Sequence, residues 1–376
     1  MARPKHTLLV ICGTRPEGIK LAPVIRELRR HDEFDVKLCL TGQHRELLAH
    51  TLEFFELKAD FNLNLMVPDQ SLHAITSGTL ARLAEVLDQA KPDVVFVQGD
   101  TSTAFAGALA SFYSKIPVAH VEAGLRTHDR SSPFPEEMNR TLLSRLAHFH
   151  FAPTATAAKN LAAEGISTHV FVVGNTSIDA LLHTVSVTHT RASAFEEQFP
   201  FATAGHKRLL VTCHRRETFG EPLEAICRAV NTLAQRFPEL EVIYPVHPNP
   251  NVLETVTRLL KGVERVHLVD PIDYPTLVWL LGQSHGILTD SGGIQEEAAT
   301  LGKPVLVLRE ITERPEGIDA GIAQLVGTKE ESIVAGVTAL LSDAALYRRM
   351  AQPKTLYGDG TASVAIAKTF KHIFRT

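Results

Sequence analysis

A short segment in the last third of the chain constrains the fold most. An apolar run at Gly286–Leu288 leads into Asp-Ser-Gly-Gly at 290–293, a helical pattern follows and stops at Gly302, and a second apolar run occupies Val305–Leu308. This order predicts strand, glycine turn, helix and strand, which is the repeating unit of parallel sheets. Because parallel strands are covered by helices on both faces, the segment favours an α/β architecture.

Short apolar runs alternate with helical patterns over nearly the whole chain, with a break at residues 183–206. The two sets predict two doubly wound, Rossmann-like α/β domains, residues 1–182 and 207–360, with a final helical segment (361–376) that completes the first domain. Ligands of this fold bind at the carboxyl ends of strands, so the active site is expected in a cleft between the domains. The expected strands are Thr7–Cys12, Asp35–Leu40, Asp93–Gln98, Val118–Glu122, Phe149–Phe151, Val170–Val173, Leu209–Cys213, Glu241–Pro245, Val266–Leu268, Gly286–Thr289 and Val305–Leu308.

Composition narrows the class of partner. With 44% hydrophobic and 21% charged residues, the chain is typical of a globular protein. A net charge of −4 without a Lys/Arg-rich block argues against nucleic acid, and no apolar run approaches the ~18 residues of a membrane span. Four cysteines without a C-x-x-C pair argue against a metal site or disulfides and for a reducing cytoplasm. No nucleic-acid, membrane or metal partner is therefore expected.

The glycine turn at 290–293 is a candidate phosphate site. The first turn of a helix presents unpaired N–H groups and the positive end of the helix dipole. Ser291, Gly292 and Gly293 have little or no side chain to keep a phosphate away. Glu297 lies one turn further along the same helix face, where its carboxylate could accept hydrogen bonds from sugar hydroxyls. The alternative is a tight turn followed by an exposed glutamate.

Three carboxylates follow predicted strands or open a predicted helix in the first domain. Glu122 ends an apolar strand, where a buried carboxylate needs partners or a raised pKa. Asp100 follows another strand, although it could simply cap a helix. Glu136 lies in the first turn of a helix, four residues before Arg140. The purely structural alternative is that Glu136 complements the helix dipole. If Asp100, Glu122 and Glu136 converge, their pKa values would be pushed apart, as acid–base chemistry requires.

Cationic and imidazole side chains follow other strands. Arg15 and Lys20 come after the first strand and are expected at the sheet edge, although they could be ordinary surface cations. In the second domain His214, Arg215 and His247 follow strands, where they could contact phosphate or transfer a proton. The alternative for each histidine is a capping role on a solvated loop.

A series of segments, in order along essentially the whole chain, resembles the non-hydrolysing UDP-N-acetylglucosamine 2-epimerases. The matching segments are GTRPEGIKLAP (13–23), TGQHREL (41–47), QGDTSTA (98–104), HVEAGLRT (120–127), SPFPEEMNR (132–140), GNTSIDAL (174–181), HRRETFGEP (214–222), YPVHPNPNV (244–252), LTDSGGIQEEAATLGKPVLVLRE (288–310), TERPEG (312–317) and YGDG (357–360).

The resemblance implies a GT-B-like arrangement of two Rossmann-like domains and the reversible interconversion of UDP-GlcNAc and UDP-ManNAc. In that mechanism UDP leaves C1 as a proton leaves C2, which gives bound 2-acetamidoglucal and UDP, and UDP then adds back as the proton returns to the opposite face. The resemblance further implies no cofactor and no NAD, a homodimer, and a supply of ManNAc-type sugars for surface polysaccharide.

The resemblance also assigns roles to residues. The acid–base chemistry would fall to Asp100, Glu122, Glu136 and His214, and which carboxylate serves which face of C2 stays open. Glu297 would bind the ribose, and the uracil would lie near Pro271–Tyr274. The substrate-binding set would be Arg15, Lys20, Arg140, Arg215, Ser291, Gly292, Gly293 and Glu297.

Some members of the family bind a second UDP-GlcNAc as an activator, and Gln43, Arg215 and His247 stand at the matching positions. Asp69, where some members carry an arginine, puts this regulatory site in doubt because an acid does not attract a diphosphate. Other functions stay open: a hydrolysing epimerase that releases ManNAc and UDP, a GT-B glycosyltransferase, and a nucleotide-sugar sensor without turnover. The convergent carboxylates favour the epimerase over the sensor, since a pure binder does not need them.

Overall fold

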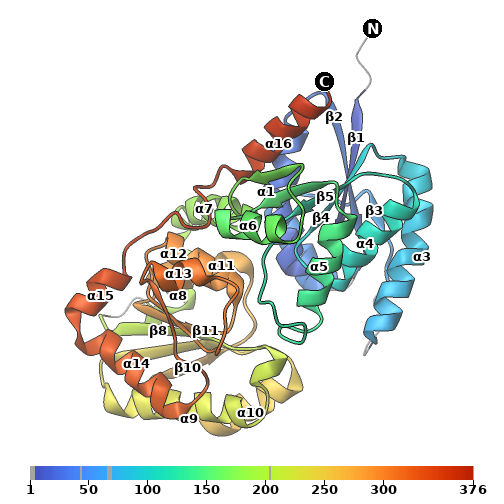
Figure 1. Cartoon of the computed structure of the whole chain (residues 1–376). Helices are drawn as coiled ribbons and strands as arrows, with labels where there is room; N and C mark the ends of the chain where they lie inside the picture. The colour runs from blue at the N-terminus through green and yellow to red at the C-terminus, as the bar shows by residue number, and fades with distance from the viewer. Residues whose placement is uncertain (1–4, 43–44, 66–69, 203–204, 376) are drawn as a thin grey trace. The chain divides into compact units, whose positions relative to one another are not determined.

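The computed structural model describes residues 5–42, 45–65, 70–202 and 205–375. The chain divides into two compact units (Figure 1). The first is Met1–Ala180 together with Tyr357–Thr376, and the second is Leu181–Leu356. Within the described ranges, no helix is both long enough and apolar enough to cross a membrane.

The first unit is built on a parallel sheet with strand order β3-β2-β1-β4-β5-β6-β7. The order reverses direction between β1 and β4, which creates the switch point at which doubly wound sheets bind ligands. The loops after these two strands, and after β5 beside them, therefore carry the candidate residues of this unit. The strands are β1 (His6–Cys12), β2 (Phe34–Leu40), β3 (Phe61–Asn62), β4 (Val94–Gln98), β5 (Val118–Val121), β6 (Phe149–Ala152) and β7 (Val170–Val172).

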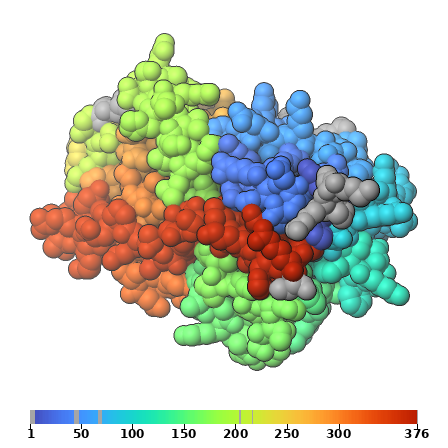
Figure 2. All heavy atoms as spheres, turned by 90° about the horizontal axis from the view of Figure 1, so that it is seen from above, coloured from blue at the N-terminus to red at the C-terminus, as the bar shows by residue number. Residues whose placement is uncertain are grey.

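The C-terminal helix of the chain packs into the first unit, although some 180 residues separate it from the preceding part of that unit (Figure 1, Figure 2). Phe370 is fully buried against the rings of Phe96, Phe149 and Phe151. The carboxylate of Asp179 accepts bonds from the first N–H groups of this helix. The helices of the unit are α1 (Arg15–Arg29), α2 (Arg45–Phe54), α3 (Leu72–Ala90), α4 (Ser102–Tyr113), α5 (Glu136–Leu146), α6 (Ala155–Ala163), α7 (Thr176–His189), which continues into the second unit, and α16 (Ala362–Ile373).

The second unit contains a parallel sheet of order β10-β9-β8-β11-β12-β13. Its strands are β8 (Lys207–Thr212), β9 (Leu240–Pro245), β10 (Val266–Val269), β11 (Gly286–Thr289), β12 (Val305–Val307) and β13 (Ala323–Leu325). Its helices are α8 (Ala192–Gln198), α9 (Glu221–Arg236), α10 (Pro250–Leu260), α11 (Tyr274–Gln283), α12 (Gly292–Thr300), α13 (Pro315–Asp319), α14 (Glu330–Ser342) and α15 (Ala344–Met350), with 3-10 turns at Pro200–Ala202 and Arg216–Thr218.

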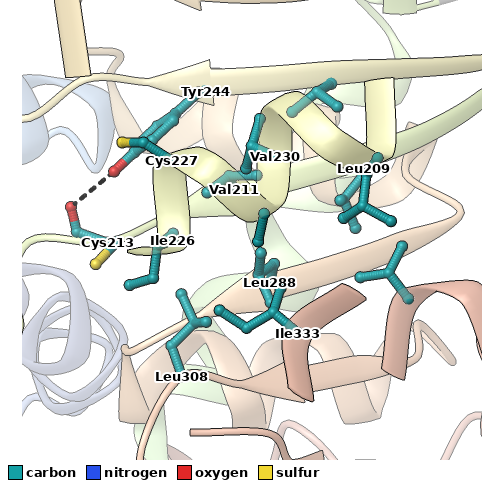
Figure 3. Packing of buried hydrophobic residues seen from close by; sticks show 14 of the residues in the cluster. Leu209, Val211, Cys213, Ile226, Cys227, Val230, Tyr244, Leu288, Leu308 and Ile333 are labelled. Atoms are coloured by element: carbon teal, nitrogen blue, oxygen red, sulfur yellow. Dashed lines mark hydrogen bonds between the residues drawn. The ribbon is translucent and has the colours of Figure 1, made fainter. Parts of the chain in front are cut away.

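The core of the second unit shows why these strands are apolar throughout. Leu209 and Val211 of β8 and Leu288 of β11 pack with Ile226 of α9 and Ile333 of α14 (Figure 3). All are buried, and the β8–β11 register places Val211 beside Leu288. The two parallel sheets confirm the predicted α/β class and its two doubly wound sets of strands.

Two edge strands were missed by the periodicity, and several predicted strands are one residue too long, among them the strand that carries Glu122. β3 and β13 are only two and three residues long and pair with one neighbour each, so they contain no apolar run to recognise. The strand predicted to end at Glu122 ends at Val121 instead. The backbone of Glu122 has a φ of +68°, which is incompatible with a strand.

We expect Gly124→Ala to destabilise the protein strongly. Gly124 follows the candidate residue Glu122 with a φ of +92°, and an added Cβ would lie 2.2 Å from the carbonyl oxygen of Ala157. Left-handed strain and overpacking together should lower the free energy of unfolding by about 3 kcal/mol or more. Gly165→Ala is the matched control, because φ is +78° but no described atom lies within 4 Å of the added Cβ. Its cost should be about 1 kcal/mol. Equal urea midpoints for the two variants would contradict the steric argument.

Candidate active site

A buried carboxylate cluster lies at the carboxyl end of β5. The side chain of Glu122 is 5% exposed, and the ammonium of Lys20 lies 2.6 Å from its Oε1 and 2.8 Å from its Oε2. The amide of Gln98 donates to Oε2 at 2.5 Å, and the amide of Asn175 donates to Oε1 at 2.8 Å. The sequence required partners for a buried acid here, and the structure supplies one cation and two neutral donors.

The conformation of Glu122 is itself informative. A non-glycine residue in the left-handed region costs on the order of 1–2 kcal/mol and persists where the surroundings hold it. The position also brings the carboxylate beside the end of β4, since a Cβ added to Gly99 would lie 3.3 Å from Oε2 of Glu122. Asp100 follows Gly99 directly, so the turns after β4 and β5 place two acidic residues close together.

Asp100 is held by helix α5. One nitrogen of the Arg140 guanidinium lies 2.5 Å from Oδ2 of Asp100, and the amide of Asn139 donates to the carbonyl oxygen of Asp100 at 2.9 Å. The side chain of Arg140 is 4% exposed, whereas that of Asp100 is 24% exposed. The buried arginine therefore holds the aspartate in place, while the aspartate stays accessible to solvent or to a ligand.

Arg140 also pairs with an acid of its own helix. Its guanidinium lies 3.3 Å from the carboxylate of Glu137, three residues earlier on α5, in addition to its ion pair with Asp100. Glu137 is buried and also accepts bonds from the backbone N–H groups of Thr127 and His128. It thereby ties the preceding loop to α5, a role that sequence reasoning missed. Glu136 opens the helix and is half-buried.

Arg15 and Lys20 lie on α1, one at its first residue and one a turn further along. The helix is capped by Thr14 and Glu17, whose carboxylate accepts from the backbone N–H and hydroxyl of Thr14 at 2.7 Å each. The same carboxylate accepts from the hydroxyl of Thr101, which caps α4, at 2.9 Å. Glu17 therefore ties together the turns after β1 and β4. Its burial raises its pKa to about 7 although these hydrogen bonds oppose the shift.

We expect acid to destabilise the first unit through two buried histidines. Desolvation lowers the pKa of His120 to about 3 and that of His150 to about 4, from an ordinary value of 6.5. Below pH 6.5 these histidines are protonated in the unfolded chain but stay neutral in the folded state. Each histidine therefore lowers the free energy of unfolding by about 1.4 kcal/mol for each pH unit of acidification. Glu17 opposes this, because its raised pKa stabilises the folded state at low pH and that contribution fades between pH 4.5 and about 7.

Taken together, His120, His150 and Glu17 should lower the free energy of unfolding by about 1.4 kcal/mol per pH unit between about pH 6.5 and 4.5, the effect of one histidine. Urea unfolding at pH 6.5 and pH 5 measures it. Glu17→Gln should steepen the loss because it removes the opposing group, whereas His150→Leu should make it shallower. Stability that does not change between the two pH values would show that these rings are not held neutral.

In the second unit, the turn after β8 is held by an aspartate that sequence reasoning treated as a turn residue. Asp290 is fully buried, and its Oδ2 accepts from the backbone N–H groups of His214 and Arg215 at 2.8 Å each. The imidazole Nδ1 of His214 lies 3.7 Å from Oδ1 of Asp290, and the side chain of His214 is 43% exposed. Asp290 thus fixes the His214–Arg215 turn beside the glycine turn at the end of β11.

The glycine turn opens helix α12, whose first N–H groups have no intrahelical acceptors. A Cβ added to Gly292 would lie 2.9 Å from both a guanidinium nitrogen of Arg314 and a carboxylate oxygen of Glu313. At Gly293 no described atom lies within 4 Å of such a Cβ, so this residue faces open space. Ser291 is half-buried before them. The arrangement leaves room for an anion at Gly293.

Glu313 gathers three arginines beside this turn. Its carboxylate lies 2.7 Å from Arg309, 2.6 Å from Arg314 and 3.7 Å from Arg215, and its side chain is 2% exposed. Arg314 is shared with a second buried acid, because its Nε also lies 2.8 Å from Oε1 of Glu296. The TERPEG segment marked the loop in the sequence, but the periodicity gave no sign that Glu313 would be its centre.

Glu297 is buried, so the alternative of an exposed glutamate is wrong. Its Oε1 accepts a bond from the hydroxyl of Tyr274 at 2.9 Å. Burial raises the pKa of Tyr274 well above its ordinary value, which keeps the hydroxyl a donor. A carboxylate has further acceptor positions, and the 271–274 segment expected near the uracil does contact Glu297 through this tyrosine.

Of the candidate regulatory residues, the structure describes Arg215 and His247. The exposed ring of His247 stacks on that of His214, with centroids 5.4 Å apart and planes 12° apart. Gln43 and Asp69 lie outside the described residues.

The chain matches known proteins over nearly its whole length. The family model described as UDP-N-acetylglucosamine 2-epimerase matches residues 26–371. The UDP-N-acetylglucosamine 2-epimerase of Salmonella typhimurium strain LT2 is 49% identical over 368 residues, which cover 97% of this chain and 98% of that protein.

Two solved structures agree with this match. The crystal structure of UDP-GlcNAc 2-epimerase from Neisseria meningitidis bound to UDP-GlcNAc is 47% identical with a TM-score of 0.96, and covers 97% of this chain and 100% of its own. The UDP-GlcNAc 2-epimerase of Methanocaldococcus jannaschii in complex with UDP-GlcNAc and UDP is 34% identical with a TM-score of 0.86, and covers 97% and 99%.

Proposed function

This chain belongs to the UDP-N-acetylglucosamine 2-epimerase family, and we propose that it interconverts UDP-GlcNAc and UDP-ManNAc reversibly without net hydrolysis. The observation that carries the proposal is the buried Glu122 carboxylate, which Lys20, Gln98 and Asn175 hold in one orientation beside the Asp100 turn. Fixed carboxylates of this kind suit proton transfer to and from carbon.

The proposed chemistry proceeds by elimination. A base takes the C2 proton, the C2–H electron pair becomes the C1=C2 double bond, and the C1–O bond to UDP breaks. The products are bound 2-acetamidoglucal and UDP. Re-addition of UDP at C1 and return of a proton to the opposite face of C2 give the epimer. Two acid–base groups are needed, and Asp100, Glu122, Glu136 and His214 are the candidates.

The leaving diphosphate would be stabilised by the second unit. In this proposal the diphosphate occupies the open position beside Gly293, where the first N–H groups of α12 at Ser291–Gly293 would bind it, with Arg215 and His214 as further donors. Glu297 would accept hydrogen bonds from the ribose. In the first unit Arg15 would contact phosphate, while Lys20 and Arg140 orient Glu122 and Asp100.

Two other functions share these residues. A hydrolysing epimerase would release ManNAc and UDP, and a sensor would bind the nucleotide sugar without turnover. Activation by a second UDP-GlcNAc at Gln43, Arg215 and His247 stays an open prediction: the exposed, stacked His247 suits it, whereas Asp69 argues against it. A shared active site between the units, UDP-ManNAc as product, a homodimer, a cytoplasmic location and supply of a surface polysaccharide also stay predictions.

The deciding experiment is proton NMR of UDP-GlcNAc incubated with the protein in D2O. UDP-ManNAc with deuterium at C2, and no accumulation of free UDP, is expected from elimination and re-addition. Free ManNAc with an equal amount of UDP would replace the proposal with the hydrolysing reaction. Unchanged, unlabelled UDP-GlcNAc would favour the sensor.

A further inference from the structure

We propose that His120 is a positioning residue for Asp100: its ring donates a hydrogen bond to the carbonyl oxygen of Gly99 and so fixes the peptide that carries the aspartate. His120 would not touch the substrate. The inference rests on the proposed role of Asp100 in the reaction, and adds a residue through which that role is maintained.

The geometry defines the state of the ring. Nε2 of His120 lies 2.7 Å from the carbonyl oxygen of Gly99, and the side chain has no exposed surface. Because a carbonyl oxygen only accepts, the hydrogen must reside on Nε2. Nδ1 is buried and makes no hydrogen bond within the part of the chain that the structure describes. The single N–H of the neutral ring is therefore donated to the carbonyl oxygen of Gly99.

The turn after β4 needs such a restraint. Gly99 has a φ of +69°, and a glycine in this region can rotate its peptide at little cost. Its N–H donates to the carbonyl oxygen of Val121 at 2.9 Å, which holds the upstream side of the residue. The ring of His120 holds the downstream peptide, and Asn139 holds the next carbonyl, that of Asp100. With both carbonyls fixed, the Asp100 side chain is directed at Arg140.

The ring also adds no charge to the site. Burial lowers the pKa of His120 to about 3, and the nearby His150 and Arg126 act in the same direction, so the imidazole stays neutral at ordinary pH. A lysine or arginine in its place would bring a cation close to Asp100 and Glu122 and compete with Arg140 and Lys20. A neutral donor restrains the turn and leaves the electrostatics of the carboxylates to their own partners.

The first test compares His120→Leu, which removes the donor, with His120→Gln, whose amide lies near the position of Nε2. His150→Leu is the control, because His150 is the register neighbour of His120 on β6 and is also buried. We expect His120→Leu to lower kcat about 10- to 100-fold, the cost of a slightly misplaced catalytic group, with KM changed less than about threefold. His120→Gln should recover most of kcat, and His150→Leu should stay near wild type.

Equal activity of His120→Leu and His150→Leu would overturn the inference, as would equal losses in the leucine and glutamine variants. If His120→Leu does not fold, His120→Asn replaces it, since the shorter amide cannot reach Gly99. The asparagine variant should then be as impaired as expected for leucine, and activity equal to that of the glutamine variant would contradict the proposal.

A double-mutant cycle tests whether His120 acts through Asp100. In a protein that already carries Asp100→Asn, the further change His120→Leu should lower kcat by less than about threefold, because the carboxylate that His120 positions is already lost. If the double variant instead loses kcat by the product of the two single-variant factors, His120 does not act through Asp100.

Nitrogen-15 NMR of the imidazoles gives a readout independent of turnover. A neutral ring with the hydrogen on Nε2 down to pH 5 is expected, and a protonated ring or the other tautomer would overturn the assignment. If the wild-type protein does not epimerise, the proposed function fails, while this signature still decides the hydrogen bond to Gly99.

Discussion

Glu122→Gln is expected to lower the epimerisation rate by at least about 10³-fold, near the upper range for loss of an acid–base group. Glutamine keeps the size of the side chain but cannot accept the C2 proton. It would also present an amide to Lys20, Gln98 and Asn175, which all donate to this position. Both effects remove the carboxylate chemistry. The measurements are kcat and the rate of deuterium incorporation at C2 in D2O.

UDP affinity should be nearly unchanged in this variant, since the proposed UDP contacts are Arg15 and residues of the second unit and do not include Glu122. A fall in thermal midpoint is expected because Lys20 loses its buried counter-charge, so rates are compared well below that midpoint. Glu56→Gln is the matched control: Glu56 is exposed, and its φ of +57° reproduces the backbone conformation of Glu122. A Glu122→Gln enzyme within tenfold of wild type would remove Glu122 from proton transfer.

Gly293→Ala should weaken UDP binding by roughly 10- to 100-fold without destabilising the fold. No described atom lies within 4 Å of the added Cβ, so the methyl group enters only open space. If a diphosphate occupies that space, the methyl group pushes it off the first N–H groups of α12 and costs charge-assisted hydrogen bonds, of about 1.5–3 kcal/mol. Isothermal titration with UDP measures the change.

The folded state should be as stable as wild type or more stable by up to about 1 kcal/mol, because alanine is the better helix former. This separates the prediction from a simple folding defect. Gly282→Ala in α11 is the control, since its added Cβ also meets no described atom within 4 Å and it is exposed. Unchanged UDP affinity in Gly293→Ala would move the diphosphate away from this helix terminus.

The apolar runs predicted the central strands well because parallel strands are covered on both faces. Residues 8–11 of β1, for example, are fully buried, so nothing polar interrupts the run. β3 and β13 could not be found in this way, because a strand of two or three residues at a sheet edge has no such requirement. The predicted strand wrongly included Glu122, because amino-acid composition does not reveal that a residue has a positive φ.

The sequence alone determined which kinds of side chain lie at the ends of the strands. That inference was possible because a parallel sheet brings all its carboxyl ends to one edge, whatever the order of the strands. It therefore predicted that a buried acid at Glu122 would need partners, and that Ser291–Gly293 would open a helix.

Only the tertiary structure decided which side chains meet. Glu122 takes its amide donors from positions 24 and 53 residues away, Gln98 and Asn175. Arg140 pairs with Asp100, 40 residues away, as well as with its helix neighbour Glu137. Periodicity records which face of its own element a residue occupies, but not which strand lies beside that element. The contacts that orient a carboxylate are set by strand order and by packing across the sheet, and these appear only when the whole unit is folded.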